Sequence, residues 1–262
     1  MAIIHETAII ASGAQIGENV KIGPYSVIGE NVIIGNDTEI KSHVVIDGYT
    51  KIGFGNVIYP FAAIGLSPQD LKYNGEKSTL EIGNNNRIRE YVTMHPGTTS
   101  GGMKTVIGSN CLFMASAHVA HDCKVGDYVI MANNATLAGH VIVGNHVIIG
   151  GLSAVHQFVR IGDYSIIGGM TGIARDLVPY SSSFSDHDKI KGVNIIGLKR
   201  AGFSNSDILL IQKVFDKLFF EDDGASFSEK IDFVKDKYKG VDKIEKIINF
   251  LQSESKRSFV QG

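Results

Sequence analysis

Residues 3–40 read IIHETAIIASGAQIGENVKIGPYSVIGENVIIGNDTEI, and isoleucine recurs at every sixth position from Ile4 onward. The same interval continues to Ile64, so eleven isoleucines share one spacing. A six-residue aliphatic repeat is typical of parallel β-helices, in which each short strand turns one aliphatic side chain inward and three strands complete a coil. The stretch therefore predicts a solenoid of roughly triangular cross-section.

The repeat returns after an interruption and runs to Ile173, so most of the chain is one β-helix, which we predict over residues 1–179. Glycine often follows the aliphatic residue because such turns need a positive φ or a close backbone approach. Two polar excursions, at 66–79 and 97–104, break the period and are expected to carry binding residues. Residues 180–262 are predicted to form an irregular connector and a C-terminal helical domain, because apolar residues three and four apart follow Ser204.

Composition excludes several classes of function. The net charge is −2, with 25 basic and 27 acidic residues, which disfavours nucleic acid as a partner. There is no run of 18 apolar residues and no export signal, so we expect no membrane span and a cytoplasmic location. Cys111 and Cys123 occupy small inward positions and are predicted to be buried, reduced thiols.

Four histidines form a candidate site, because side chains 18 residues apart stack on neighbouring coils. They span about two coils and share one corner of the triangular prism: His118, His121, His140 and His156. An imidazole can take or give a proton near neutral pH, and Asp122 directly follows His121 as a possible orienting carboxylate. The remaining histidines outside this neighbourhood are interpreted as surface residues: His5, His43, His146 and His187.

A metal site is the first alternative, since three imidazoles with an open position suit zinc, as in the trimeric β-helical γ-class carbonic anhydrases. The H-x-x-H spacing of His118 and His121 is not the usual pattern of that class, and the nearby Asp70 and Lys72 favour an anionic organic ligand. We therefore predict no metal. A structural, ice-binding solenoid would need a flat threonine array, which the sequence lacks.

Five stretches closely resemble the UDP-N-acetylglucosamine O-acyltransferase family, and the similarity runs the whole length of the chain. They are QDLKY (69–73), AHVAHDC (117–123), ANNATLAGH (132–140), AVHQF (154–158) and GVNIIGLKRAGF (192–203). The resemblance implies a left-handed β-helix, contrary to the usual right-handed crossover, and a homotrimer with active sites between neighbouring chains. It also implies transfer of an (R)-3-hydroxyacyl chain from acyl carrier protein to the 3-hydroxyl of UDP-N-acetylglucosamine, the first step of lipid A biosynthesis, without cofactor or metal.

By the same resemblance, His121 is the general base, Asp122 orients it, and the Gly139 N–H stabilises the oxyanion. Gly169 matches the position that sets acyl length, where glycine leaves room for a long chain. The positions implied to bind substrates are Asp70, Lys72, His95, His118, His140, His156, Gln157, Asn194 and Arg200.

The chain departs from the family at two positions: Ile196 stands where an acid is common, and Pro96 where an arginine is common. A sister N-acyltransferase family carries a uridine-binding domain ahead of the repeat, whereas here the repeat starts at Ile4. Serine and maltose acetyltransferases place their helices differently. A zinc hydratase or another hexapeptide acyltransferase therefore remains the alternative.

Overall fold

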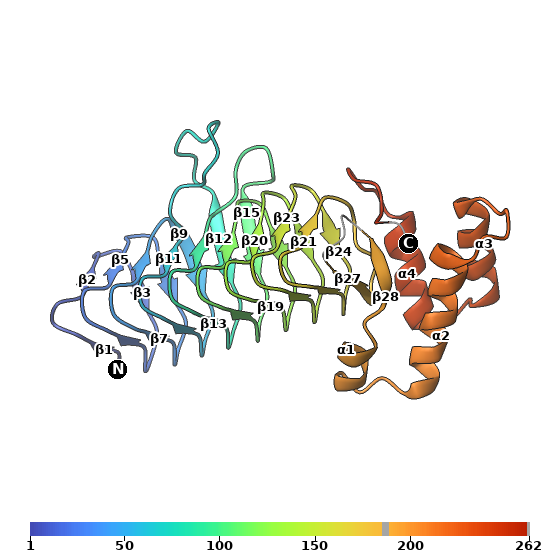
Figure 1. Cartoon of the computed structure of the whole chain (residues 1–262). Coiled ribbons are helices and arrows are strands. Elements are labelled where there is room, and N and C mark those ends of the chain that lie inside the picture. The colour runs from blue at the N-terminus through green and yellow to red at the C-terminus, as the bar shows by residue number, and fades with distance from the viewer. Residues whose placement is uncertain (185–188, 261–262) are drawn as a thin grey trace.

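The computed structural model describes residues 1–184 and 189–260. Figure 1 shows triangular coils stacked from the N-terminus towards a group of helices at the C-terminal end. The strands of these described residues form three sheets, here A, B and C, one on each side of the triangle, and almost every strand runs parallel to its partners on the coils before and after it. The predicted class, a left-handed parallel β-helix of hexapeptide repeats with C-terminal helices, is confirmed.

Sheet A contains β1 (Ile3–Ile4), β4 (Lys21–Ile22), β7 (Glu39–Ile40), β10 (Val57–Ile58), β13 (Arg87–Ile88), β16 (Leu112–Phe113), β19 (Ile130–Met131), β22 (Ile148–Ile149), β25 (Ile166–Ile167), β27 (Ser181–Ser183) and β28 (Ile190–Val193). Sheet B contains β2 (Ile9–Ile10), β5 (Val27–Ile28), β8 (Val45–Ile46), β11 (Ala63–Ile64), β14 (Thr93–Met94), β17 (His118–Val119), β20 (Thr136–Leu137), β23 (Ala154–Val155) and β26 (Gly172–Ile173). Sheet C contains β3 (Gln15–Ile16), β6 (Ile33–Ile34), β9 (Tyr49–Ile52), β12 (Thr79–Ile82), β15 (Lys104–Ile107), β18 (Lys124–Val125), β21 (Ile142–Val143) and β24 (Arg160–Ile161).

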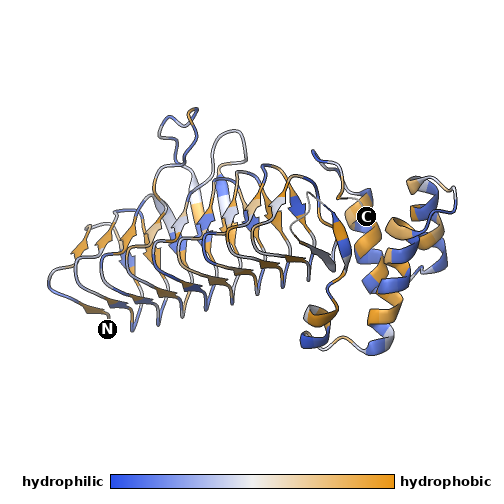
Figure 2. Cartoon of the chain, in the orientation of Figure 1, coloured by the Kyte–Doolittle hydropathy of each residue, from blue (hydrophilic) through white to orange (hydrophobic). Residues whose placement is uncertain are grey.

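The repeated aliphatic residues fill the interior, as their spacing predicts. Ile28, Ile46 and Ile64 are at most 1% exposed, and the residue two places earlier is buried as well, as at Val44. Figure 2 shows the resulting alternation of hydrophobic and hydrophilic residues along the coils. Ile4 is 45% exposed because it belongs to the first coil, which has no neighbour on its outer side.

The sequence predicts glycines with positive φ or in close contact with neighbouring backbone at the turns between strands. Close contact is what most of these glycines show. Most glycines after the aliphatic residue do not have positive φ; at Gly35, for example, an added Cβ would lie 2.6 Å from the Gly53 carbonyl carbon of the next coil. The left-handed conformation is taken instead by non-glycine corner residues, such as Tyr128 (φ 58°) and His146 (φ 57°). This conformation costs roughly 1–2 kcal/mol per residue, and stacking between successive coils offsets part of the cost. The Tyr128 and His146 rings, for instance, are 4.6 Å apart.

Both excursions leave the same corner, between sheets B and C. The first connects β11 to β12 and the second connects β14 to β15, and Figure 1 shows both projecting from one edge of the β-helix. They are joined to each other where the Thr99 N–H donates to Glu76 Oε1 at 3.4 Å. The two excursions therefore stand over one site.

The predicted irregular connector contains two strands that lengthen sheet A. β27 pairs in parallel with β25, and β28 pairs antiparallel with β27, so the sheet ends at Val193. Neither strand carries the hexad pattern, which is why the sequence showed no sign of them. The helices follow: α1 (Ile195–Arg200), α2 (Asn205–Phe215), the π-helix η1 (Asp216–Phe220), α3 (Phe227–Lys237) and α4 (Asp242–Gln252).

Ser204 caps α2 through a capping box with Asp207, as its position predicts. The helices pack on the last coils, where Lys246 of α4 pairs with Asp163. After α4 the chain returns along the β-helix as residues 253–260, here the C-terminal strap, and Phe259 forms a parallel bridge with Asp176. No helix of the described residues is long and apolar enough to cross a membrane.

Candidate active site

His121 and Asp122 lie at the corner that follows β17. Asp122 has a φ of 60°, a conformation that aspartate tolerates better than most residues. His121 Nδ1 lies 2.8 Å from Asp122 Oδ2, and the His121 side chain is 8% exposed. With Nδ1 hydrogen-bonded to the carboxylate, Nε2 is the nitrogen left to exchange a proton with a substrate.

Asp122 is held in place by the second excursion. Thr98 donates twice to its carboxylate, from the backbone N–H to Oδ1 at 2.9 Å and from Oγ1 to Oδ2 at 2.6 Å. The Asp122 N–H donates to Thr105 Oγ1 at 2.8 Å. Gly101 approaches so closely that an added Cβ would lie 1.9 Å from Asp122 Cγ. The carboxylate is therefore fully buried and its direction is fixed.

The next coil brings Gly139 against the His121 ring. A Cβ added at Gly139 would lie 2.5 Å from His121 Cε1 and 2.6 Å from Nε2, so any side chain at this position would displace the imidazole ring. Among the described residues the Gly139 N–H donates no hydrogen bond. His140 follows, with its ring 5.1 Å from that of His121 and its Nδ1 3.9 Å from Asp122 Oδ2.

His95 and His118 form a second pair beside the first, with ring centroids 5.2 Å apart. His118 Nδ1 is 2.7 Å from Thr93 Oγ1. Burial, together with repulsion from His118 and His121, lowers the pKa of His95 to about 4, and burial also lowers the pKa of His118. His95 and His118 are therefore neutral at neutral pH.

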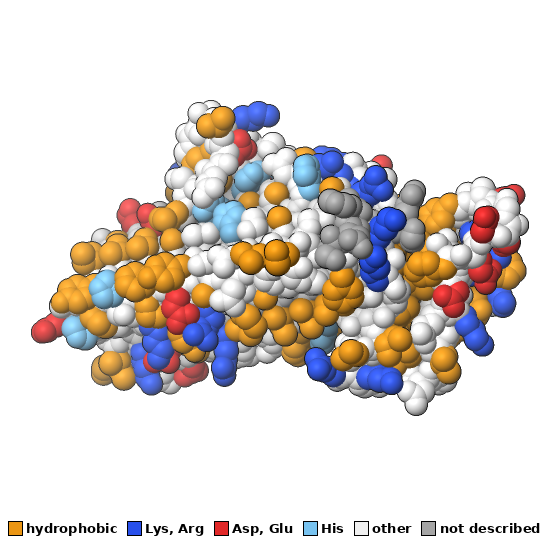
Figure 3. All heavy atoms as spheres, viewed as in Figure 1, with side chains coloured by type: hydrophobic (Ala, Val, Ile, Leu, Met, Phe, Trp, Pro, Cys, Tyr) orange, Lys and Arg blue, Asp and Glu red, His pale blue; other side chains and the backbone are white. Residues whose placement is uncertain are grey.

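The first excursion reaches the same site. The Gln69 N–H donates to His95 Nδ1 at 3.3 Å, and the Lys72 N–H donates to Asp70 Oδ1 at 3.0 Å. The Asp70 charge acts on His140, where it opposes the burial that lowers that pKa. Lys72 itself is exposed on the excursion. In Figure 3, histidine side chains lie directly beneath the protruding excursions.

Three predicted residues are not near His121 within one chain. Asn194 caps α1, where its Oδ1 accepts from the Gly197 N–H at 3.0 Å, and Arg200 ends the same helix. Gly169 lies at the corner between sheets A and B, whereas His121 lies at the corner between sheets B and C. Figure 1 shows α1 well separated from the excursions. His156 and Gln157, by contrast, follow β23, one coil beyond His140.

The expected surface histidines differ in their environments. His5 and His43 are exposed, and His146 stacks between Tyr128 and Tyr164. His187 lies outside the described residues. Ile196, the departure from the family on α1, is 66% exposed, whereas Pro96 is buried beside His95.

Among the described residues, one group of donors could hold a metal ion: His121, Asp122 and His140 offer atoms within 4.8 Å of one another. This set contains two imidazoles rather than the three of the zinc alternative. Both Asp122 oxygens also accept short hydrogen bonds already, from His121 and Thr98. The arrangement fits an oriented proton-transfer pair better than a metal centre.

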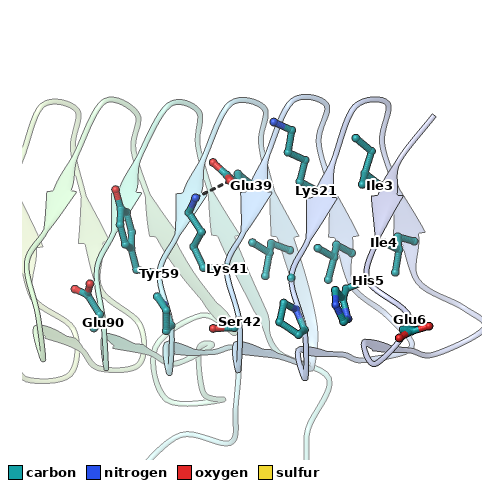
Figure 4. A pocket seen from close by; sticks show the side chains of 15 residues that line it. Ile3, Ile4, His5, Glu6, Lys21, Glu39, Lys41, Ser42, Tyr59 and Glu90 are labelled. Atoms are coloured by element: carbon teal, nitrogen blue, oxygen red, sulfur yellow. Dashed lines mark hydrogen bonds and ion pairs between the residues drawn. The ribbon is translucent and has the colours of Figure 1, made fainter.

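A groove of about 960 Å³ runs along the outer face of the N-terminal coils, lined by residues that include Ile3, His5 and Lys21 (Figure 4). Its ion pair joins Lys41 Nζ to Glu39 Oε1 at 2.6 Å. His5 Nδ1 bonds to a threonine hydroxyl rather than to a carboxylate. The groove lacks the oriented imidazole of the histidine site. It follows sheet A and the corner between sheets A and B, whereas His121 lies at the corner between sheets B and C.

Comparison with known sequences finds acyltransferases that match this chain along almost its whole length. The family model described as "Udp N-acetylglucosamine O-acyltransferase; Domain 2" matches residues 176–260, and the bacterial transferase hexapeptide model matches residues 13–48 and 104–139. The acyl-[acyl-carrier-protein]–UDP-N-acetylglucosamine O-acyltransferase of Thermodesulfovibrio yellowstonii is 47% identical over 253 residues, covering 97% of each chain. The enzyme of the same name from Rickettsia canadensis is 49% identical and covers 98% of this chain and 96% of its own.

Solved structures give the same result. LpxA from Acinetobacter baumannii superposes with a TM-score of 0.94 at 43% identity, covering 99% of this chain and all of that one. The UDP-N-acetylglucosamine O-acyltransferase of Moraxella catarrhalis has a TM-score of 0.94 at 44% identity, covering 98% of this chain and 99% of its own. The relatives at 47% and 49% identity cover 97% and 98% of this chain, and the chain belongs to the UDP-N-acetylglucosamine O-acyltransferase family.

Proposed function

We propose that the chain catalyses the first step of lipid A biosynthesis, moving an (R)-3-hydroxyacyl chain from acyl carrier protein to the 3-hydroxyl of UDP-N-acetylglucosamine. The observation that carries this proposal is the buried His121–Asp122 pair with the Gly139 backbone against its ring. Direct transfer of an acyl group needs a base for the hydroxyl and a donor for the oxyanion, and this corner offers both.

In the proposed mechanism His121 Nε2 takes the proton from the sugar hydroxyl as the oxygen attacks the thioester carbonyl. Asp122 holds Nδ1 and stabilises the imidazolium that forms. The Gly139 N–H donates to the oxyanion of the tetrahedral intermediate. When this intermediate collapses, the C–S bond breaks and His121 returns the proton to the leaving thiolate.

The surrounding residues are proposed to bind the substrates. Asp70 and Lys72 on the first excursion contact the sugar and an anionic group near the donor. The pocket beside the base is lined by His95, His118, His140, His156 and Gln157. Asn194 and Arg200 take the nucleotide end, and Gly169 sets acyl length. No metal or cofactor takes part in this mechanism.

The last three residues require a second chain. Because Asn194, Arg200 and Gly169 lie away from the His121 corner, they join one site only if a neighbouring copy supplies them. We propose a homotrimer with sites between its chains, working in the cytoplasm. Light scattering at known concentration tests the assembly, and a monomer that retains full activity would contradict it.

Acyl transfer tests the function directly. Purified protein is incubated with UDP-N-acetylglucosamine and a panel of (R)-3-hydroxyacyl carrier proteins of different chain length. The expected product is the 3-O-ester, identified by mass and by the shift of the sugar H3 resonance. Full acyl transfer after dialysis against a chelator is expected, whereas zinc-dependent hydration of carbon dioxide in place of acyl transfer would favour the hydratase alternative.

A further inference from the structure

The C-terminal strap is firmly attached to the β-helix. The Asp176 N–H donates to the Ser258 carbonyl at 2.8 Å, and the Val260 N–H donates to the Asp176 carbonyl at 2.9 Å. The Asp176 side chain is fully buried, and its carboxylate accepts from Arg160 Nε at 2.6 Å and from Ser255 Oγ at 2.5 Å. The strap is therefore a built element of the structure, with a defined path past the last coils.

This path carries Arg257 to the histidine site. Its Nε donates to the Gln157 carbonyl at 2.9 Å, and its Nη2 lies 2.7 Å from His156 Nδ1. A guanidinium has five N–H donors in a planar fork, so three remain after these two contacts. Arg257 is therefore oriented by the β-helix and still able to bind a ligand.

Lys256 lies on the same edge. Its Nζ is 4.4 Å from the centroid of the Phe158 ring, which stacks on His140 at 4.4 Å. His140 in turn contacts His121 at 5.1 Å, so the ammonium is three side-chain contacts from the proposed base. Burial is the main cause that lowers the pKa of His140, and the charge of Lys256 contributes.

Neither cation has an acidic partner in the part of the chain that the structure describes. Within residues 1–184 and 189–260, no carboxylate lies within 4.0 Å of Lys256 or Arg257. Figure 3 shows lysine and arginine side chains on the face that carries the histidines, towards the helical end. Two unneutralised cations beside a catalytic corner favour an anionic ligand, and arginine with lysine is a combination suited to phosphate.

We propose that Lys256 and Arg257 form a phosphate-binding subsite at the edge of the active site. The inference rests on the proposed function, whose two substrates both carry phosphate: the diphosphate of the nucleotide sugar and the phosphodiester of the carrier's phosphopantetheine arm. Arg257 binds the phosphate oxygens through its free N–H groups, and Lys256 adds charge. The strap, distant from His121 in sequence, is thereby part of substrate recognition.

The test compares Lys256→Ala and Arg257→Lys with wild type, using Lys239→Ala as a control for the loss of one exposed positive charge. Binding of UDP-N-acetylglucosamine is measured by calorimetry, which needs no turnover. The donor arm compares acyl-phosphopantetheine with acyl-pantetheine, which lacks the phosphate, both by calorimetry and as substrates. Thermal unfolding checks that each variant is folded.

Lys256→Ala is expected to weaken one phosphate-bearing ligand about tenfold, with kcat retained and Lys239→Ala unchanged. A loss confined to UDP-N-acetylglucosamine assigns the subsite to the diphosphate, and a lost preference for acyl-phosphopantetheine assigns it to the carrier arm. Arg257→Lys is expected to lose part of the affinity for the same phosphate-bearing ligand, because a lysine ammonium lacks the planar set of N–H donors of a guanidinium.

Unchanged affinity of folded Lys256→Ala for both ligands would overturn the proposal. If wild type transfers no acyl group but binds a phosphate ligand more tightly than Lys256→Ala does, the proposed reaction is wrong and the subsite stands.

Discussion

Replacing Thr98 by valine tests whether the second excursion controls the catalytic pair. The change keeps the side-chain volume and removes the hydroxyl that donates to Asp122 Oδ2 at 2.6 Å. Thr98 is 2% exposed, and a buried hydrogen bond to a charged acceptor contributes about 1.5–3 kcal/mol. The backbone N–H of residue 98 still holds Oδ1, so the loop is expected to remain closed.

The expected result is a fall in kcat of roughly tenfold, since a carboxylate held by one bond fewer orients His121 less well and 1.4 kcal/mol corresponds to a factor of ten. KM for UDP-N-acetylglucosamine is expected to change little, because Thr98 is buried beneath the site. Unfolding in urea, at one protein concentration, is expected to show a loss of about 1.5–3 kcal/mol.

Thr98→Ser is the matched control, because serine keeps the hydroxyl and is expected to restore most of kcat. A valine variant with wild-type kcat, or a serine variant as slow as valine, would refute the argument that the hydroxyl positions Asp122.

Three further predictions concern the same corner and the core. Gly139→Ala is expected to fold but to lose activity by about 10²-fold or more, since its Cβ would lie 2.5 Å from the His121 ring; a variant with normal kcat would contradict the close approach. Because burial lowers the pKa of His95 from 6.5 to about 4, the unfolded state gains the proton first as pH falls. Stability should therefore drop between about pH 6.5 and 4, by at most about 1.4 kcal/mol per pH unit, and His95→Gln should have a shallower slope in urea titrations. Burial raises the pKa of Cys111 to about 11 and of Cys123 to about 12, so neither thiol should react with a disulfide reagent at pH 8 until the protein unfolds.

The repeat was sufficient to predict the β-helix because one periodic position decides the path of each strand. An aliphatic residue at every sixth place has one arrangement that buries all of them, as Ile28 and Ile46 do. The histidine cluster was predictable for the same reason, since 18 residues return the chain to the same corner and place His140 beside His121.

The other contacts of the candidate site are made by segments that lie outside the six-residue repeat. Thr98 reaches Asp122 from 24 residues away through an excursion whose path no spacing defines. Arg257 reaches Gln157 across 100 residues, after the described part of the chain has passed through four α-helices and a π-helix. The positive φ of the corner residues could not be predicted from the sequence either. Tyrosine and histidine have no conformational preference for positive φ, and here stacking on the next coil stabilises it.

The central claim is that His121 is the base, and the direct test is the rate of acyl transfer to radiolabelled UDP-N-acetylglucosamine by His121→Ala beside wild type. The account predicts a loss of about 10²–10⁴-fold in kcat with unchanged assembly and unchanged affinity for the nucleotide sugar. A folded His121→Ala variant that transfers the acyl chain at the wild-type rate would contradict it.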